Sequence, residues 1–244
     1  GIYPLLMGSG TAGLLGFLVF EYRSSSPILD INLIIRNRVF AFSNLATLIN
    51  YAASFGISFF FSLYLQVVRG FSPQAAGMVL IIQPLFQMVL SPIFGRLADR
   101  FSPPGLATLG MGLCALGLAG AAQVHEMTPM PVIIGVLGLM GVGFGVFSSP
   151  NMITVMGSVS PRHYGSASSL VATMRTLGML CCMTIITLIF NHFMGDHSVS
   201  PETQSAFLAS MHLSMVIFSS LCVVGILFSI GRLKPASPID NASE

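Results

Sequence analysis

Long apolar runs separated by short polar stretches dominate the pattern along this chain. An apolar run of about 20 residues has the length of a helix that crosses a lipid bilayer. Seven such runs occur, at residues 5–20, 39–67, 74–94, 105–124, 131–159, 166–193 and 206–230. The connections are short except for residues 23–38 and 195–205. The pattern predicts an all-α, polytopic membrane protein without an inserted soluble domain.

Composition supports this fold class. The chain has 244 residues, of which 54% are hydrophobic and only 7% are charged. Soluble domains carry about 25% charged residues, because their surfaces face water. The net charge of +2 is too small to indicate a nucleic-acid partner. The chain opens with Gly1 and an apolar run that has no basic leader, so we expect its first residues to come from the middle of a longer polypeptide, with a tag remnant as the alternative.

The sequence offers little for catalysis or metal binding. The cysteines all lie in apolar runs, where they favour packing over disulfide or metal chemistry. His192, Asp196 and His197 have a metal-compatible spacing, but two histidines in an external loop more often serve as solvated residues. No nucleophile elbow, phosphate loop or HExxH motif occurs. We therefore expect no enzyme activity, no cofactor and no metal. The cysteines are Cys114, Cys181, Cys182 and Cys222.

The basic residues predict the orientation, because arginine and lysine are retained on the cytoplasmic side of a membrane. One orientation places nearly all of them inside, with only Arg69 outside and Arg175 within a helix. We therefore expect a protein of the cell membrane with a cytoplasmic carboxy terminus. The residues placed inside are Arg23, Arg36, Arg38, Arg96, Arg100, Arg162, Arg232 and Lys234.

Glycine and proline mark special positions within the runs. Gly141 and Gly145 form a GxxxG spacing, which lets two helix backbones approach closely in lipid. Pro84, Pro92 and Pro150 lie inside apolar runs and should kink or interrupt their helices. Simple bending and a role in gating both remain open for these prolines.

The segment from Gly95 to Phe101, GRLADRF, resembles the GxLaDrxG signature of the major facilitator superfamily. Residues 102–104, SPP, replace the usual glycine and basic residues. Residues 27–40 resemble the entry to the ninth helix of the fourteen-helix drug:proton antiporters of the EmrB/QacA type. Residues 179–182 depart from that family's pattern. The further stretches that follow the pattern are 64–66, 72–73, 76–77, 143–150, Gly165, Arg175 and Gly178.

The resemblance implies a six-helix major-facilitator half-bundle preceded by one extra transmembrane helix. Residues 1–21 would be the extra helix, 22–38 a cytoplasmic linker, 39–233 the carboxy-terminal six-helix domain, and 234–244 a cytoplasmic tail. In relatives the other half carries the membrane-embedded acidic residues that couple transport to protons. The implied partners are thus protons, membrane lipid, the missing amino-terminal half and a small lipophilic or cationic substrate.

The implied function is efflux of lipophilic or cationic drugs or biocides, by proton antiport through alternating access. Export of an endogenous metabolite, a siderophore or an amino acid is an alternative with the same fold. A truncated membrane fragment that does not transport is an alternative of another class. A membrane enzyme is not favoured, because no catalytic constellation occurs.

Polar residues follow one face of the predicted helix 39–67. At 100° per residue they fall within an arc of about 120°. Such a stripe provides either hydrogen bonds between helices or a water-accessible wall, and we predict the wall because seven polar residues exceed the needs of packing. The stripe comprises Asn44, Thr47, Asn50, Tyr51, Ser54, Ser58 and Ser62.

Two other helices contribute candidates for a substrate cavity. Gln83, Gln87 and Ser91 share one face of the predicted helix 74–94. Helix 131–159 combines neutral polar groups with Met and Phe, which suits loosely held lipophilic ligands, although core packing explains Met and Phe equally well. The residues of this helix are Ser148, Asn151, Thr154, Ser158, Met140, Phe144 and Phe147.

Four residues are candidates for gating. Arg175 is the only charged residue deep inside a predicted helix, where snorkelling and a buried pairing both remain open. Gly95, Asp99 and Arg100 belong to the signature loop. The resemblance implies that Asp99 docks onto a helix start in the opposite half and holds the cytoplasmic side closed. A surface ion pair with Arg96 or Arg100 is the alternative.

Overall fold

The computed structural model describes residues 37–195 and 199–231, and this part of the chain is built from helices joined by turns. The predicted leading helix, nearly all of the linker and the tail lie outside the described residues. Two 3-10 turns, Pro161–His163 and Pro201–Thr203, precede the last two helices. The elements are α3 (Arg38–Leu63) with its π-helical extension η1 (Tyr64–Val68), α4 (Pro73–Leu80), α5 (Ile82–Leu97), α6 (Pro103–Ala122), α7 (Met130–Gly157), α8 (Tyr164–Met194) and α9 (Gln204–Gly231).

The six helices predicted between residues 39 and 230 are confirmed, with two differences in the second. A turn at Ile81 divides this helix into α4 and α5. Pro84 explains the division, because it has no N–H for the Leu80 carbonyl and its ring crowds that group. The helix also continues past residue 94, so Gly95 belongs to α5 rather than to a loop. At Pro92 and Pro150, by contrast, α5 and α7 continue.

Side-chain caps explain where three helices begin. The side chains of Asn37, Ser72 and Ser102 accept hydrogen bonds from backbone N–H groups in the first turns of α3, α4 and α6. These groups would otherwise lack a partner at a helix start. Pro73 and Pro103 follow two of the caps, at a position where proline costs no hydrogen bond.

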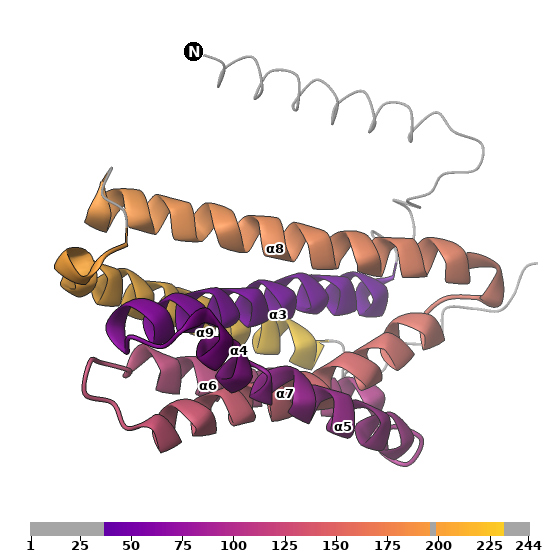
Figure 1. The fold of residues 1–244 in the computed structure, drawn as a ribbon. Helices are drawn as coiled ribbons and strands as arrows, with labels where there is room; N and C mark the ends of the chain where they lie inside the picture. Colours follow the sequence, from indigo (N-terminus) through magenta and orange to yellow (C-terminus); the bar gives the residue numbers. More distant parts are fainter. Residues whose placement is uncertain (1–36, 196–198, 232–244) are drawn as a thin grey trace, which may run out of the picture.

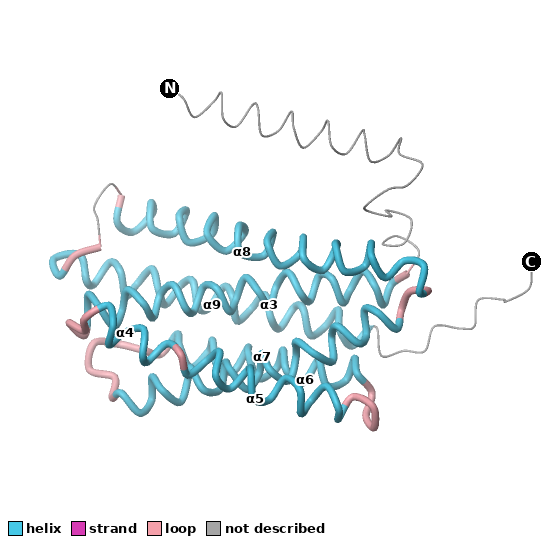
Figure 2. Tube along the Cα trace, turned by 45° about the vertical axis from the view of Figure 1, so that its right-hand side comes forward, coloured by secondary structure: helices cyan, strands magenta, loops and turns pink. Residues whose placement is uncertain are grey.

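The helices form a layered bundle whose axes run roughly side by side (Figures 1 and 2). Helix α8 packs on α3 and α9, α9 packs on α6, and α7 packs between α6 and α5. Helix α3 also contacts α7. Six helical spans of the described chain are long and apolar enough to cross a membrane. The protein is therefore a multi-pass membrane protein.

Glycines set how closely α7 approaches its neighbours. A Cβ atom built on Gly141 would lie 2.5 Å from the Gln83 carbonyl oxygen of α5, and one on Gly145 would lie 3.0 Å from Leu90 Cβ. The close approach predicted from the GxxxG spacing is thus confirmed. Gly143 makes a second contact that the spacing did not predict, because its Cβ would lie 2.8 Å from the Cys114 backbone nitrogen of α6.

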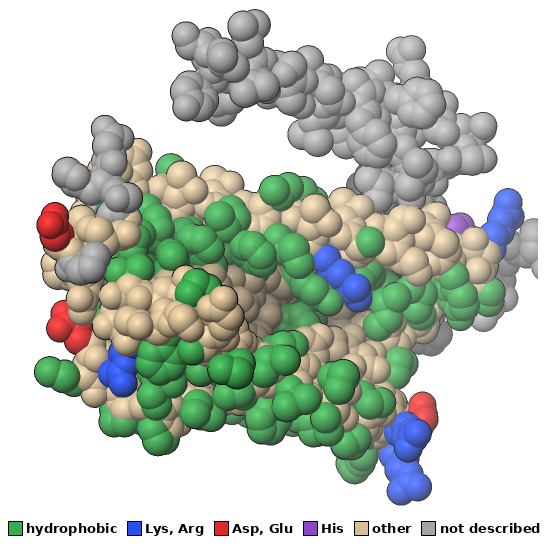
Figure 3. Space-filling view, in the orientation of Figure 1, with side chains coloured by type: hydrophobic (Ala, Val, Ile, Leu, Met, Phe, Trp, Pro, Cys, Tyr) green, Lys and Arg blue, Asp and Glu red, His purple; other side chains and the backbone are tan. Residues whose placement is uncertain are grey.

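The outer surface is apolar along the middle of the bundle. Met78 and Met88, on α4 and α5, are 71% and 69% exposed. In the face drawn in Figure 3, most charged side chains gather at the two ends, and apolar side chains cover much of the region between them. This distribution fits a bilayer environment, where apolar groups face lipid and charges meet water.

The cysteines are free thiols. Cys114, Cys182 and Cys222 are buried, as expected for packing residues, whereas Cys181 is exposed on α8.

Candidate functional site

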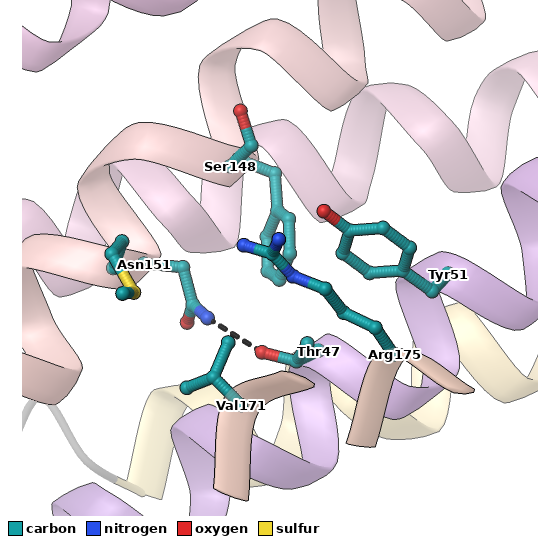
Figure 4. A pocket seen from close by; sticks show the side chains of 8 residues that line it. Thr47, Tyr51, Ser148, Asn151, Val171 and Arg175 are labelled. Atoms are coloured by element: carbon teal, nitrogen blue, oxygen red, sulfur yellow. Dashed lines mark hydrogen bonds between the residues drawn. The ribbon is translucent and has the colours of Figure 1, made fainter. Parts of the chain in front are cut away.

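A small hollow lies where α3, α7 and α8 meet, and it brings five of the predicted site residues together (Figure 4). About 210 Å³ of space there is free of protein atoms, and part of it is open to the surroundings. Apolar side chains complete the wall. The polar lining consists of Thr47, Tyr51, Ser148, Asn151 and Arg175, and the apolar lining of Phe147, Met152 and Val171.

Arg175 enters this hollow from α8. It lies eleven residues after the start of the helix, which places its Cα about 16 Å along the helix axis. Its guanidinium carbon is 5.1 Å from the centroid of the Tyr51 ring, within the range of a cation–π contact. Its Nε atom is buried and has no hydrogen-bond partner in the described part of the chain.

Tyr51 of α3 is held between Phe144 of α7 and Arg175 of α8. Its ring meets the Phe144 ring edge to face, with the centroids 5.0 Å apart and the planes at 79°. Its other contact is the Arg175 guanidinium. The side chain is half-buried, so the ring contributes both to packing and to the wall of the hollow.

Hydrogen bonds join Ser148 and Asn151 of α7 to neighbouring helices. The Asn151 Nδ2 group donates to Thr47 Oγ1 at 2.9 Å and to the Ser43 carbonyl oxygen at 3.2 Å. The Ser148 and Ser91 hydroxyl groups lie 3.2 Å apart and join α7 to α5. Since Asn151 is only 3% exposed, its two bonds replace hydration that the side chain has lost.

A second polar cluster joins α3 to α5 outside the hollow. Gln83 donates from Nε2 to Ser54 Oγ at 2.7 Å and accepts at Oε1 from Ser58 Oγ at 3.2 Å. Gln83 is 4% exposed, so this contact lies within the bundle. At these three positions the polar groups are engaged in hydrogen bonds between helices, which was the alternative to a water-accessible wall.

Other predicted cavity residues lie away from the hollow. Asn50 is fully buried, and its Oδ1 atom is 3.9 Å from Cys114 Sγ of α6. Asn44 is 4% exposed and donates to the Phe40 carbonyl oxygen of its own helix. Gln87 is half-buried, with its backbone close to Gly145. Of the stripe on α3, only two residues line the hollow. The wider cavity therefore stays a prediction.

The predicted gating residues of the signature segment gather at one end of the bundle. A Cβ atom on Gly95 would lie 2.6 Å from Ser149 Oγ, so this glycine allows α5 to contact α7. Asp99 and Arg100 are exposed in the turn between α5 and α6. The backbone N–H of Asp99 donates to the Arg96 carbonyl oxygen, which shapes this turn. The docking of Asp99 onto an opposite half stays a prediction.

Sequence reasoning missed Met152 and Val171. Their positions held a usable signal, since Val171 precedes Arg175 by one helical turn and Met152 follows Asn151. The predicted loop histidine lies outside the described residues together with Asp196. Among the side chains that the structure does describe, no group of three metal-ligating residues occurs.

Comparisons with known proteins give one family. The family model of the Major Facilitator Superfamily matches residues 5–244. Riboflavin transporter RibZ of Clostridioides difficile (strain 630) is 26% identical over 91% of this chain and 49% of its own length. An uncharacterized transporter of Escherichia coli (strain K12), YebQ, is 30% identical over 85% of this chain and 44% of its own.

Multidrug efflux pump LfrA of Mycolicibacterium smegmatis (strain ATCC 700084 / mc(2)155) is also similar to the chain. It is 29% identical over 72% of this chain and 35% of its own length. The chain thus spans about half the length, or less, of these curated relatives.

Proposed function

The chain belongs to the Major Facilitator Superfamily, a family of membrane transporters rather than enzymes, and we propose that it supplies the carboxy-terminal half of a drug:proton antiporter. The substrates would be lipophilic small molecules such as drugs or biocides. The likeness to the multidrug efflux pump LfrA supports this direction of transport. Residues 27–40 support the fourteen-helix type, and the distribution of arginine and lysine supports a cell-membrane protein with its carboxy terminus in the cytoplasm.

The hollow between α3, α7 and α8 is the observation on which this proposal rests. Its wall combines the aromatic rings of Tyr51 and Phe147 with the polar groups of Ser148 and Asn151. Apolar surface with a few converging polar groups is typical of sites for small organic molecules. Such sites hold drug-sized ligands in about 300–1,000 Å³. The space that this chain alone encloses at the hollow is far smaller, so the hollow would form one wall of a site that the complementary half completes.

Alternating access would expose this site to each side of the membrane in turn. Helices α3 to α9 contain no Asp or Glu residue. A carboxylate that carries the proton must therefore come from the complementary half. We use the name complete transporter for this chain joined to that half. This chain on its own should not export substrate.

An efflux assay tests the proposal. Cells that lack their own efflux pumps would express the chain alone or the complete transporter, and the retention of several lipophilic dyes would be measured. We expect proton-dependent export only from the complete transporter. Export by the chain alone would contradict the requirement for the other half. No export of any tested compound by a complete transporter that is present in the membrane would favour a fragment without transport activity.

Transport of a riboflavin-like metabolite is a second candidate function. The match to RibZ covers 91% of this chain, whereas the match to LfrA covers 72%. Competition in membrane vesicles separates the two candidates. If the metabolite is the substrate, unlabelled riboflavin should suppress transport of labelled riboflavin, and lipophilic drugs should not.

A further inference from the structure

The positive charge in the hollow indicates which class of lipophilic molecule can bind there. This inference rests on the proposed export function. Arg175 is the only charged residue of α3 to α9 that lies away from the helix ends. An arginine side chain stays protonated in proteins and offers five N–H donors but no acceptor. A positive charge within the bundle therefore favours ligands that bring negative charge or strong acceptors.

The contacts of Arg175 leave donors available. Its contact with Tyr51 uses the ring face and involves no hydrogen-bond acceptor. Among the eight side chains drawn in Figure 4, the only hydrogen bond marked joins Asn151 to Thr47. The buried Nε atom has no partner among the described residues. A buried charged donor without an acceptor is costly, so an oxygen atom that reaches it would bind favourably.

The surroundings of Arg175 suit an aromatic body next to this oxygen atom. Phe147 and Val171 line the same hollow and are buried, and Tyr51 is half-buried. Ser148 and Asn151 already have hydrogen-bond partners in neighbouring helices, so they shape the wall without adding a charge. The polar lining contains no carboxylate that could attract a cation.

We propose that the hollow is a subsite for the anionic oxygen of a lipophilic aromatic anion, such as a carboxylate or a sulfonate. Arg175 binds the oxygen atom, and the aromatic rings bind the body of the molecule. Organic cations are disfavoured at this subsite because they meet a like charge in a medium that screens poorly. This charge preference differs from the cationic substrates that the family resemblance had suggested.

A matched pair of dyes tests the preference. Fluorescein and rhodamine 123 share a xanthene ring system, but the first is an anion and the second a cation at neutral pH. Binding of each dye to the complete transporter in lipid nanodiscs would be measured by fluorescence anisotropy. We expect fluorescein to bind at least about tenfold more tightly than rhodamine 123, since charge complementarity sets specificity.

Three variants assign the preference to Arg175. Arg175→Gln keeps hydrogen-bonding capacity and loses the charge, so fluorescein should bind about tenfold more weakly, while rhodamine 123 binds as well as before or better. Arg175→Lys should retain most of the preference. Arg162→Gln removes the same charge from an exposed position before α8 and should leave the binding of both dyes unchanged. Immunoblots confirm equal amounts of each variant in the membrane.

Two results would overturn the subsite. Equal weakening of both dyes in Arg175→Gln would mean that the arginine supports the packing of α3 and α8. No change for either dye would mean that a carboxylate of the complementary half, rather than a substrate, occupies the guanidinium group. Binding is measured without transport, so the proposed function can fail separately. Charge-selective binding without export would contradict only that function, and export insensitive to Arg175→Gln would contradict only the subsite.

Discussion

Helix α7 makes two kinds of contact with its neighbours, one between backbones and one between side chains. At Gly141 and Gly143, backbone meets backbone. A Cβ atom on Gly143 would lie 2.8 Å from the Cys114 nitrogen of α6, and one on Gly110 would lie 2.5 Å from the Phe147 nitrogen. At the hollow, side chain meets side chain, as where Asn151 Nδ2 of α7 donates to Thr47 Oγ1 of α3 at 2.9 Å.

The difference separates the scaffold from the site. Backbone contacts between small residues have no side-chain freedom, so they fix α7 against α5 and α6. The hollow is lined by side chains, and apart from Asn151, which bonds α7 to α3, their exchange should disturb the helix packing less than a change at these glycines. Substrate preference can therefore vary at the hollow while the bundle stays the same. Four experiments test this comparison.

The largest effect is expected for Gly143→Leu. The side chain would have to occupy space held by the backbone of α6, which cannot move away without separating two helices. We expect a loss of about 3 kcal/mol or more of folding free energy, and little protein in the membrane. The measurement is the folded fraction in detergent, by fluorescence-detected size-exclusion chromatography.

Gly135→Leu is the matched control for this substitution. It lies on the same helix, but a Cβ atom there meets nothing within 4 Å. The folded fraction of this variant should equal that of the wild type. If both glycine variants lose the same amount of folded protein, then leucine at any position of α7 is harmful and the backbone contact is not the cause.

Asn151→Leu should have the next largest effect. It removes the hydrogen bonds from α7 to Thr47 and to the Ser43 carbonyl oxygen of α3. We expect a loss of about 1–3 kcal/mol, visible as a lower unfolding temperature in detergent. Thr154→Val is the control, because within the described part of the chain the Thr154 hydroxyl group donates to the Pro150 carbonyl oxygen of its own helix and to no other helix. An equal decrease in unfolding temperature for both variants would show that the hydrogen bonds between α7 and α3 add no more stability than a bond within α7.

Tyr51→Ala should act on selectivity rather than on the amount of protein. The ring is part of the wall of the hollow, and different substrates use it to different extents. Export of some compounds should change by about tenfold or more while others are unaffected, because pocket contacts discriminate to this extent. Tyr51→Phe keeps the ring and should behave like the wild type for most compounds. A uniform loss of all transport in Tyr51→Ala would instead indicate a structural role.

The smallest perturbation is single-cysteine labelling in the complete transporter without its native cysteines. Cysteines at Tyr51 and Ser148 should react with a water-soluble thiol reagent, and bound substrate should slow the reaction. A cysteine at Asn50 should stay unreactive, since this side chain is fully buried against α6. Equal reactivity at positions 50 and 51 would show that the whole stripe on α3 is wet, and not only the part at the hollow.

Much of the fold could be predicted because the bilayer constrains it directly. A helix that crosses a hydrocarbon layer needs a long apolar run, and the chain displays these runs without reference to any tertiary contact. The position of Pro84 predicted the interruption between α4 and α5, and the GxxxG spacing predicted the contact of Gly141 with α5. The contact of Gly143 with α6 could not be predicted from the sequence, because a small residue does not reveal which neighbouring helix it faces.

The sequence by itself determined the membrane fold and the residue types that a site could use, because hydropathy and polarity are local properties. Only the tertiary structure decided which polar residues meet. It placed Tyr51 beside Arg175, turned Asn50 toward Cys114, and paired Ser54 with Gln83. These outcomes depend on how α3 is rotated against five other helices. A polar stripe about 120° wide is compatible with several such rotations, and packing selects one of them.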